Sequence, residues 1–211
     1  MKKVFACFLL CLITITPLAQ ASKEANDYIA AANKLAIEKK YKESILKYKK
    51  ALELDPKNSR INLMLGLAYA NTGAMDDALN YVRIASQKEP SYTTFYNLGL
   101  IHGARKETES SVEAFNKALS YNPDSANAHY RKGLVYSQAN AHQEAISAFE
   151  KALKLNPQLD EARVGLVGAY LKLDNRAAAM DQIEEFRKMK KDDFASILEA
   201  RIKENGKAPK R

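Results

Sequence analysis

The sequence predicts an all-α protein of about five helix-turn-helix repeats, with a signal peptide before them and a capping helix after them. Three observations carry this prediction. Prolines recur at intervals of 34, 33 and 34 residues, and an alanine stands five residues before each of them. Between these marks, apolar residues recur at three- and four-residue steps, which is the spacing of one face of an α-helix. The prolines are Pro56, Pro90, Pro123 and Pro157.

Residues 1–21 have the layout of a secretory signal peptide. Lys2 and Lys3 form a positive start, an uncharged apolar run spans 4–15, and Ala19 and Ala21 are the small residues that signal peptidase reads. We therefore expect cleavage after Ala21. Because short signals are typical of bacteria, the periplasm is the expected location, with full secretion as the alternative. A retained membrane anchor competes with this interpretation, but a spanning helix needs about 20 apolar residues, and this run has twelve.

Loss of the signal peptide simplifies the chemistry of the chain. Cys7 and Cys11 are its only cysteines, so the mature chain has no disulfide, thiolate metal ligand or cysteine nucleophile. Loss of Lys2 and Lys3 leaves 31 basic residues against 25 acidic ones, a net charge of +6. This mild basicity is compatible with weak attraction to acidic envelope surfaces. Nucleic acid is a poor candidate partner for an exported protein.

Further columns keep the phase of the prolines and alanines. A small residue stands seven positions before each repeated alanine, and a bulky one lies between the two. A glycine marks the first half of three units. Agreement of several independent columns indicates a repeat rather than chance. The columns are Ser44, Ala78, Ser111 and Ala145; Tyr48, Val82, Phe115 and Phe149; and Gly66, Gly99 and Gly133.

Each unit is predicted to be two antiparallel helices. Residues 41–54 carry apolar residues in helical phase, and Pro56 ends that segment because proline cannot continue a helix. The next helix is expected over 59–71, with Gly73 as a left-handed cap. Small residues such as Gly66 let the two axes approach closely. Since one unit cannot bury its own apolar face, the units must stack.

These columns resemble the tetratricopeptide repeat, which has Leu, Gly or Ala, and Tyr in its first helix and Ala, an aromatic residue, Ala and Pro in its second. The second unit carries Leu65, Gly66, Tyr69, Ala78, Val82, Ala85 and Pro90, with the bulky Val82 where the pattern has an aromatic residue. The resemblance implies a right-handed superhelical solenoid over 22–204. Its repeats are 25–58, 59–91, 92–125, 126–159 and a degenerate 160–191, followed by a capping helix over 192–204 and a disordered basic tail over 205–211.

The fifth repeat departs from the pattern. Val167 replaces the glycine, Phe186 replaces the second alanine, and no proline follows. Terminal repeats are expected to be atypical. In the capping helix we expect Phe194, Ile197 and Leu198, together with Ile202, to form the packed side.

The resemblance also implies a binding groove, because the first helices of successive units line a concave face in this family. Leucines and tyrosines at equivalent positions would form a continuous apolar strip there, asparagines would pair with a peptide backbone, and Arg131 would hold a carboxylate. The competing interpretation is that some of these residues pack between neighbouring first helices. The predicted groove residues are Asn33, Arg60, Leu63, Leu67, Tyr96, Asn97, Leu100, Asn127, Tyr130, Arg131 and Leu134.

Some members of the family bind the acidic C-terminus of chaperones through lysine, asparagine and arginine residues. Only Asn97 and Arg131 stand on comparable positions in one alignment of the repeats, and Asn33 does so in another. Leu63 and Asn127 occupy positions where two of the lysines would be. The sequence therefore argues against a chaperone-tail function.

The sequence offers no catalytic site, cofactor site or metal site. His102, His129 and His142 fall in two different units without zinc-ligand spacing, and we interpret them as core or surface residues. No glycine-rich phosphate loop is present. We therefore expect a non-catalytic periplasmic scaffold or adaptor that binds a protein or peptide in assembly of an envelope complex. The alternatives are a cell-wall or polysaccharide-associated accessory protein and a secreted effector that binds a host protein.

Overall fold

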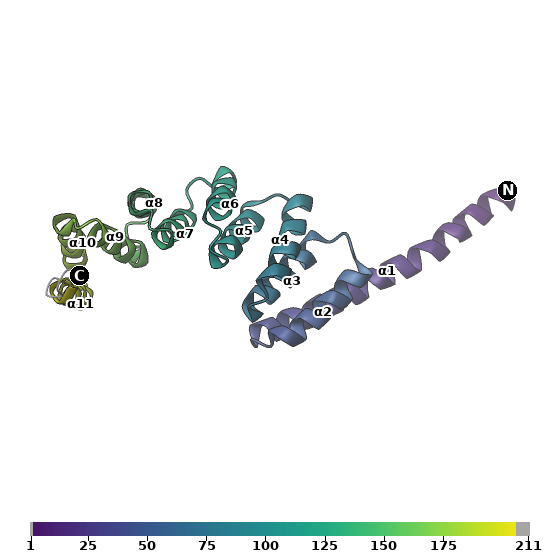
Figure 1. Ribbon diagram of the computed structural model, residues 1–211. Helices are drawn as coiled ribbons and strands as arrows, with labels where there is room; N and C mark the ends of the chain where they lie inside the picture. The colour runs from purple at the N-terminus through teal and green to yellow at the C-terminus, as the bar shows by residue number, and fades with distance from the viewer. Residues whose placement is uncertain (1, 206–211) are drawn as a thin grey trace. The chain divides into compact units, whose positions relative to one another are not determined.

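The computed structural model describes the backbone of residues 2–205 and the side chains of residues 20–200, 202 and 203. The described backbone forms eleven α-helices and no strand (Figure 1). They make about five helix pairs and a C-terminal helix, so the predicted all-α repeat array is confirmed. The side chains of the predicted signal run up to residue 19, and residues 206–211 of the predicted tail, lie outside the described residues.

The chain divides into two compact units, one ending at Arg105 and one beginning at Lys106. The division falls inside the third repeat, after its first helix. The first unit contains α1 (Lys2–Ile37), α2 (Tyr41–Leu54), α3 (Ser59–Thr72), α4 (Met75–Lys88) and α5 (Tyr92–Ala104). The second contains α6 (Thr108–Tyr121), α7 (Ala126–Gln138), α8 (His142–Leu155), α9 (Asp160–Lys172), α10 (Arg176–Lys188) and α11 (Asp192–Asn205).

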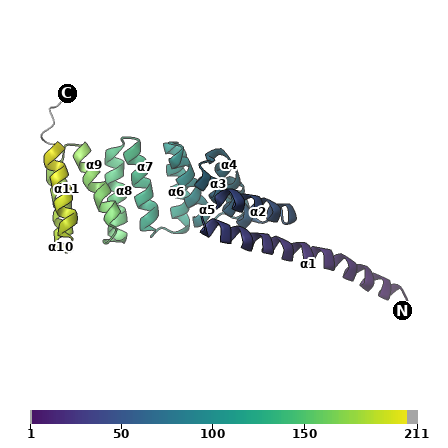
Figure 2. The ribbon, with the colours of Figure 1, turned by 90° about the horizontal axis from the view of Figure 1, so that it is seen from below.

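Within each unit, helices that follow each other in the chain pack side by side. In the first unit α1 packs on α2 and α3 on α4, and in the second unit α7 packs on α8 and α9 on α10. Both ribbon views show α7 and α8 as such a neighbouring pair (Figures 1 and 2). Helices at the same place in successive repeats also touch, as α3 and α5 do, and α7 and α9. These contacts stack one repeat on the next.

The turn inside each repeat uses one left-handed residue at the same place. Gly73 has φ of 83° and caps α3, which confirms the sequence prediction. The equivalent turns of the other repeats use residues other than glycine in this left-handed conformation. For an ordinary residue that carries a Cβ, the conformation costs about 1–2 kcal/mol. These residues are Lys39, Lys106, Asn140 and Asp174, with φ between 56° and 61°. The geometry of the repeat, rather than the residue type, therefore sets the left-handed position.

Close helix crossings depend on the predicted small residues. A Cβ added to Gly66 would lie 2.5 Å from a methyl of Val82 and 3.1 Å from the carbonyl oxygen of Ala78. In the second unit the buried ring of Phe149 fills the equivalent place. A Cβ on Gly133 of α7 or on Gly165 of α9 would come within 2.6 Å of this ring. Phe149 is fully buried, so it ties α8 to both neighbouring helices.

The C-terminal helix covers the last repeat with a face that matches the predicted one only in part. Ala195, Leu198 and Ile202 pack on the cluster that contains Phe186. Phe194 and Ile197, which we expected on the packed side, are 50% and 58% exposed. Phe186 stands where the earlier repeats carry an alanine, and it shares its buried cluster with Ala195 of α11. The ring of Phe194 stacks on Phe186 with only part of its surface.

Candidate peptide-binding site

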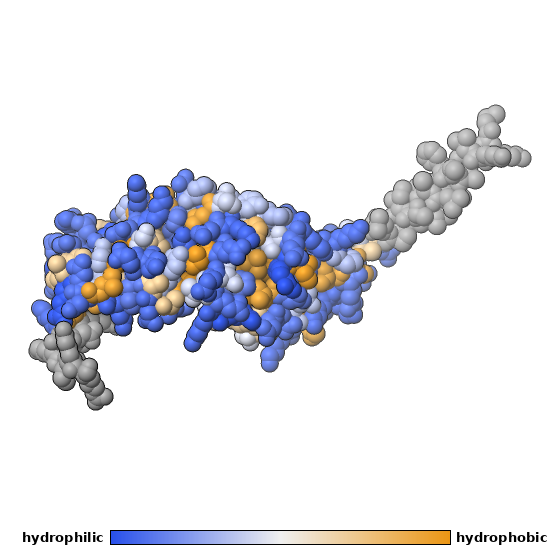
Figure 3. All heavy atoms as spheres, turned by 45° about the horizontal axis from the view of Figure 1, so that its top comes forward, coloured by the Kyte–Doolittle hydropathy of each residue, from blue (hydrophilic) through white to orange (hydrophobic). Residues whose placement is uncertain are grey.

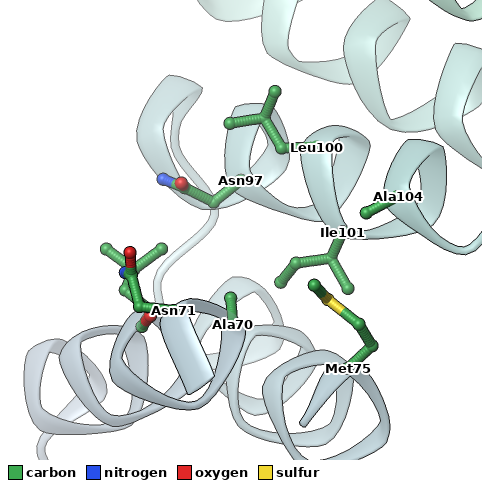
Figure 4. A pocket seen from close by; sticks show the side chains of 8 residues that line it. Ala70, Asn71, Met75, Asn97, Leu100, Ile101 and Ala104 are labelled. Carbon is green, nitrogen blue, oxygen red and sulfur yellow. The ribbon is translucent and has the colours of Figure 1, made fainter. Parts of the chain in front are cut away.

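The first unit contains a cleft of about 270 Å³ lined by α3, α4 and α5. Three predicted groove residues, Leu67, Asn97 and Leu100, line it together. Met75 of α4 and Ile101 of α5 were not predicted and complete its apolar wall. Figure 4 shows the side chains of Met75 and Ile101 on one side of the cleft and those of Asn71 and Asn97 on the other.

Each of the two asparagines of this cleft uses one amide N–H within its own helix and keeps its side-chain oxygen as an acceptor. The Nδ2 atom of Asn97 donates to the carbonyl oxygen of Thr93, and that of Asn71 donates to the carbonyl oxygen of Leu67, each at 2.8 Å. A carbonyl oxygen can only accept, so one N–H of each amide is used within its own helix and each Oδ1 remains an acceptor. The cleft therefore suits a ligand that donates N–H groups beside an apolar side chain, as an extended peptide does.

The other predicted residues of the first unit have different roles. Leu63 is buried, with 8% of its surface exposed, so the prediction that it lines an open groove is wrong, and the competing interpretation of interhelical packing holds for it. Asn33 accepts a 2.6 Å hydrogen bond from the hydroxyl of Tyr48. Arg60 is exposed at the start of α3. Tyr96 is half-buried and stacks on Tyr92 one turn earlier, with ring centroids 5.4 Å apart.

The second unit contains a cleft of about 430 Å³ lined by α7, α9 and α11. Its apolar wall includes the predicted Tyr130 and Leu134, with Val164 of α9 and Phe194 of α11. Tyr130 rests on Phe149, with ring centroids 6.0 Å apart. Phe194 could be noticed in the sequence as an apolar residue of the last helix. Its place in the cleft depends on how α11 packs, which no spacing reveals.

Charged groups surround this second cleft. The guanidinium of Arg131 lies over the Tyr130 ring, 5.6 Å from its centroid. Glu161 and Asp160 lie on the α9 side. Asp160 is neutralised by Lys191, whose Nζ lies 2.6 Å from both carboxylate oxygens. The predicted Asn127 is exposed at the start of α7. The role of Arg131 in holding a carboxylate stays a prediction, as does the extension of the apolar strip from Leu100 to Leu134.

The histidines and acidic residues do not assemble a metal site in the described part of the chain. His129 is half-buried, and its ring donates from Nε2 to the carbonyl oxygen of Pro123 at 3.4 Å. Among the residues with described side chains, no helix is long and apolar enough to cross a membrane. Figure 3 shows separate apolar patches between hydrophilic ones on one face of the molecule.

Paired helices, left-handed turns at a fixed position and small residues at the crossings define the class of helical-repeat proteins. Family models agree with this at the level of sequence. A TPR repeat model matches residues 32–73, and two tetratricopeptide repeat models match residues 96–160 and 136–201. The chain is a tetratricopeptide repeat protein, a family of protein-interaction scaffolds that typically have no catalytic activity.

Known proteins and structures show the same likeness. The chain is 27% identical over 104 residues to the Hsp70-Hsp90 organizing protein of Triticum aestivum, a match that covers 49% of this chain and 18% of that protein. The chain is also similar to the crystal structure of the MamA protein, with 27% sequence identity and a TM-score of 0.73 over 80% of this chain and 93% of that one. The crystal structure of YrrB, described as a TPR protein with an unusual peptide-binding site, is 19% identical, with a TM-score of 0.70 over 89% of this chain and 97% of that one.

Proposed function

We propose that this protein is a periplasmic scaffold or adaptor that acts in assembly of an envelope complex. It binds a polypeptide through two clefts, the one lined by α3, α4 and α5 in the first unit and the one lined by α7, α9 and α11 in the second, which we call the first-helix clefts. The observation that carries the proposal is the composition of the cleft in the first unit. It joins an apolar wall of Leu67, Leu100 and Ile101 to two acceptor oxygens from Asn71 and Asn97. This combination matches the alternating side chains and N–H groups of an extended peptide.

Export is supported by the sequence of the first 21 residues, which have a positive start, an apolar run and small residues before the expected cleavage point. A protein exported in this way meets partners of the cell envelope. A scaffold of this kind brings such partners together without chemistry of its own.

The likeness to the Hsp70-Hsp90 organizing protein does not extend the chaperone function to this chain. The match covers only 18% of that protein. Leu63, which stands where a lysine would hold a chaperone tail, is buried. Asn127, which stands at another such place, carries no charge.

The experiment is a crosslinking pulldown from envelope extracts with two cleft variants made separately. One is Asn97→Ala with Leu100→Ala in the first unit, and the other is Tyr130→Ala with Arg131→Ala in the second. If a partner captured by the wild-type chain is lost in a cleft variant whose helical content is confirmed, the result supports the proposal. Retention of every partner in both variants would show that the clefts are not the binding surface.

Matched controls remove similar side chains outside the clefts. Leu46 of α2 is 63% exposed and Tyr121 of α6 is 53% exposed, so Leu46→Ala and Tyr121→Ala remove apolar surface of a similar kind. The control variants are expected to keep the partner. A cell fractionation assay tests the location separately, since recovery of the chain only in the cytoplasm would refute export.

A further inference from the structure

The fourth repeat breaks the internal pattern of the array at a core position. In the second, third and fifth repeats the seventh residue of the first helix is a leucine, and all three leucines are buried. They are Leu65, Leu98 and Leu166, with 0%, 8% and 2% of their surface exposed. The fourth repeat has Lys132 at this position. A cation in a leucine column costs stability, because burial removes water from its charge.

Lys132 lines a polar cleft of about 340 Å³ between α7 and α8. Lys132 and His129 line it from α7, and Ser147, Lys151 and Glu144 line it from α8. All of these residues belong to the second unit.

Lys132 is half-buried without a carboxylate partner among the described residues. Its Nζ donates to the amide oxygen of Asn116 at 3.1 Å, and this oxygen carries no full charge. Burial lowers the pKa of Lys132. The structure thus holds an ammonium group that has lost part of its hydration and gained only one neutral acceptor, an arrangement that a bound anion would stabilise.

The net charge of the cleft fits a single negative charge. Burial lowers the pKa of His129, the hydrogen bond to Pro123 opposes this, and the nearby Lys132 and Lys151 lower the pKa further. The imidazole is therefore neutral at neutral pH. Two lysines against Glu144 leave one net positive charge in the cleft.

We propose that the cleft between α7 and α8 binds a side-chain carboxylate of a partner protein, held by the ammonium groups of Lys132 and Lys151 with the hydroxyl of Ser147 as a further donor. A polyanion is disfavoured by Glu144. The carboxylate of Glu144 lies seven residues before Lys151 on α8, about 10 Å along the helix. A row of negative charges bound along the cleft would therefore be repelled by Glu144. A peptide with one acidic residue would avoid this repulsion.

The cleft is separate from the surface on which the proposed function rests. At about 100° per residue, the side chains of His129 and Lys132 leave α7 on the side opposite to those of Tyr130 and Leu134. Variants of this cleft therefore leave the first-helix clefts intact. Failure of one proposal does not decide the other.

The test is an NMR titration of the isotope-labelled full chain with a blocked peptide, Ala-Ala-Glu-Ala-Ala, and with its Gln counterpart. We expect saturating shifts of α7 and α8 amides with the Glu peptide, and binding at least about tenfold weaker with the Gln peptide. Lys132→Leu and Lys151→Ala should each weaken binding by about tenfold or more, which corresponds to about 1.4 kcal/mol. The matched control Lys154→Ala removes an exposed lysine of α8 that does not line the cleft and should change affinity by less than about twofold.

Several results would overturn the proposal. One is the absence of saturating shifts in the wild-type chain, and another is unchanged binding in Lys132→Leu or Lys151→Ala. A titration with inorganic phosphate that saturates the same amides at lower concentration than the peptide would refute a carboxylate as the ligand. Thermal unfolding provides a second readout. Lys132→Leu restores the leucine column and should raise the melting temperature, whereas a lower melting temperature would show that the cation is structural.

Discussion

The packing of Phe149 allows a paired test in which two glycines of one helix respond in opposite directions. Gly165 and Gly168 both lie inside α9 (Asp160–Lys172). A Cβ added to Gly165 would lie 2.6, 2.9 and 2.9 Å from three carbons of the Phe149 ring, whereas a Cβ added to Gly168 meets nothing within 4 Å. Replacement of either glycine by alanine therefore gives the same gain in helix propensity, but only the new methyl at Gly165 collides with a neighbouring side chain.

The expected magnitudes follow from these distances. Replacing glycine by alanine inside a helix stabilises it by about 1 kcal/mol, which is the expected gain for Gly168→Ala. Overpacking a core costs about 1–3 kcal/mol. Gly165→Ala combines both effects, so its net result is a loss of up to about 2 kcal/mol.

Removal of the ring should reverse the sign at Gly165. Phe149→Ala by itself costs about 3–5 kcal/mol, but it frees the space that the new methyl needs. In this background Gly165→Ala should stabilise α9 by about 1 kcal/mol, as Gly168→Ala does in both backgrounds. Native-state hydrogen exchange of α8 and α9 amides measures the local free energies of opening. Equal stabilisation by Gly165→Ala and Gly168→Ala in the wild-type background would refute the packing that the structure shows.

Three further predictions concern single contacts. Tyr48→Phe removes the hydrogen bond to Asn33 and should lower the free energy of unfolding by about 0.5–1.5 kcal/mol; an unchanged denaturation midpoint would contradict this role. Lys191→Ala removes the partner of Asp160 and should speed hydrogen exchange in α11, with unchanged exchange there as the contrary result. Because the pKa of His129 in the folded chain lies below its ordinary value of 6.5, the unfolded chain takes up this proton first as pH falls, so stability should drop below about pH 6.5. Melting temperatures across this range should fall less in His129→Asn than in the wild type, and equal slopes would exclude His129 as the cause.

The sequence predicted the repeats well because their core residues act locally. Pro56 ends a helix by its own covalent structure, and Gly73 signals a left-handed turn because glycine tolerates positive φ. The equivalent turn at Lys39 or Asp174 gave no such signal. Those residues adopt positive φ because the two helices of the repeat must pack at a fixed distance, which is a tertiary demand.

The clefts were predictable only in part, for a similar reason. Leu67, Asn97 and Leu100 could be placed together because the resemblance to the family says that first helices are neighbours. Met75 escaped because it belongs to a second helix. Leu63 was assigned to the open face although it is buried, because helical phase alone does not separate a groove from the interface beside it.

Comparison of repeats within one chain separates polar residues that serve the architecture from those that do not. His129 and Arg163 occupy the same position in successive repeats, and both donate to the carbonyl oxygen of the preceding repeat's proline, at 3.4 and 3.1 Å. A shared contact of this kind explains a polar side chain there as part of the junction between repeats. Lys132 has no such counterpart, because the same position holds a buried leucine in the second, third and fifth repeats. A half-buried cation that the repeat does not require reduces stability, and natural sequences tend to accept such a cost at functional sites. Lys132 is therefore the residue in the fourth repeat whose presence is better explained by binding than by folding.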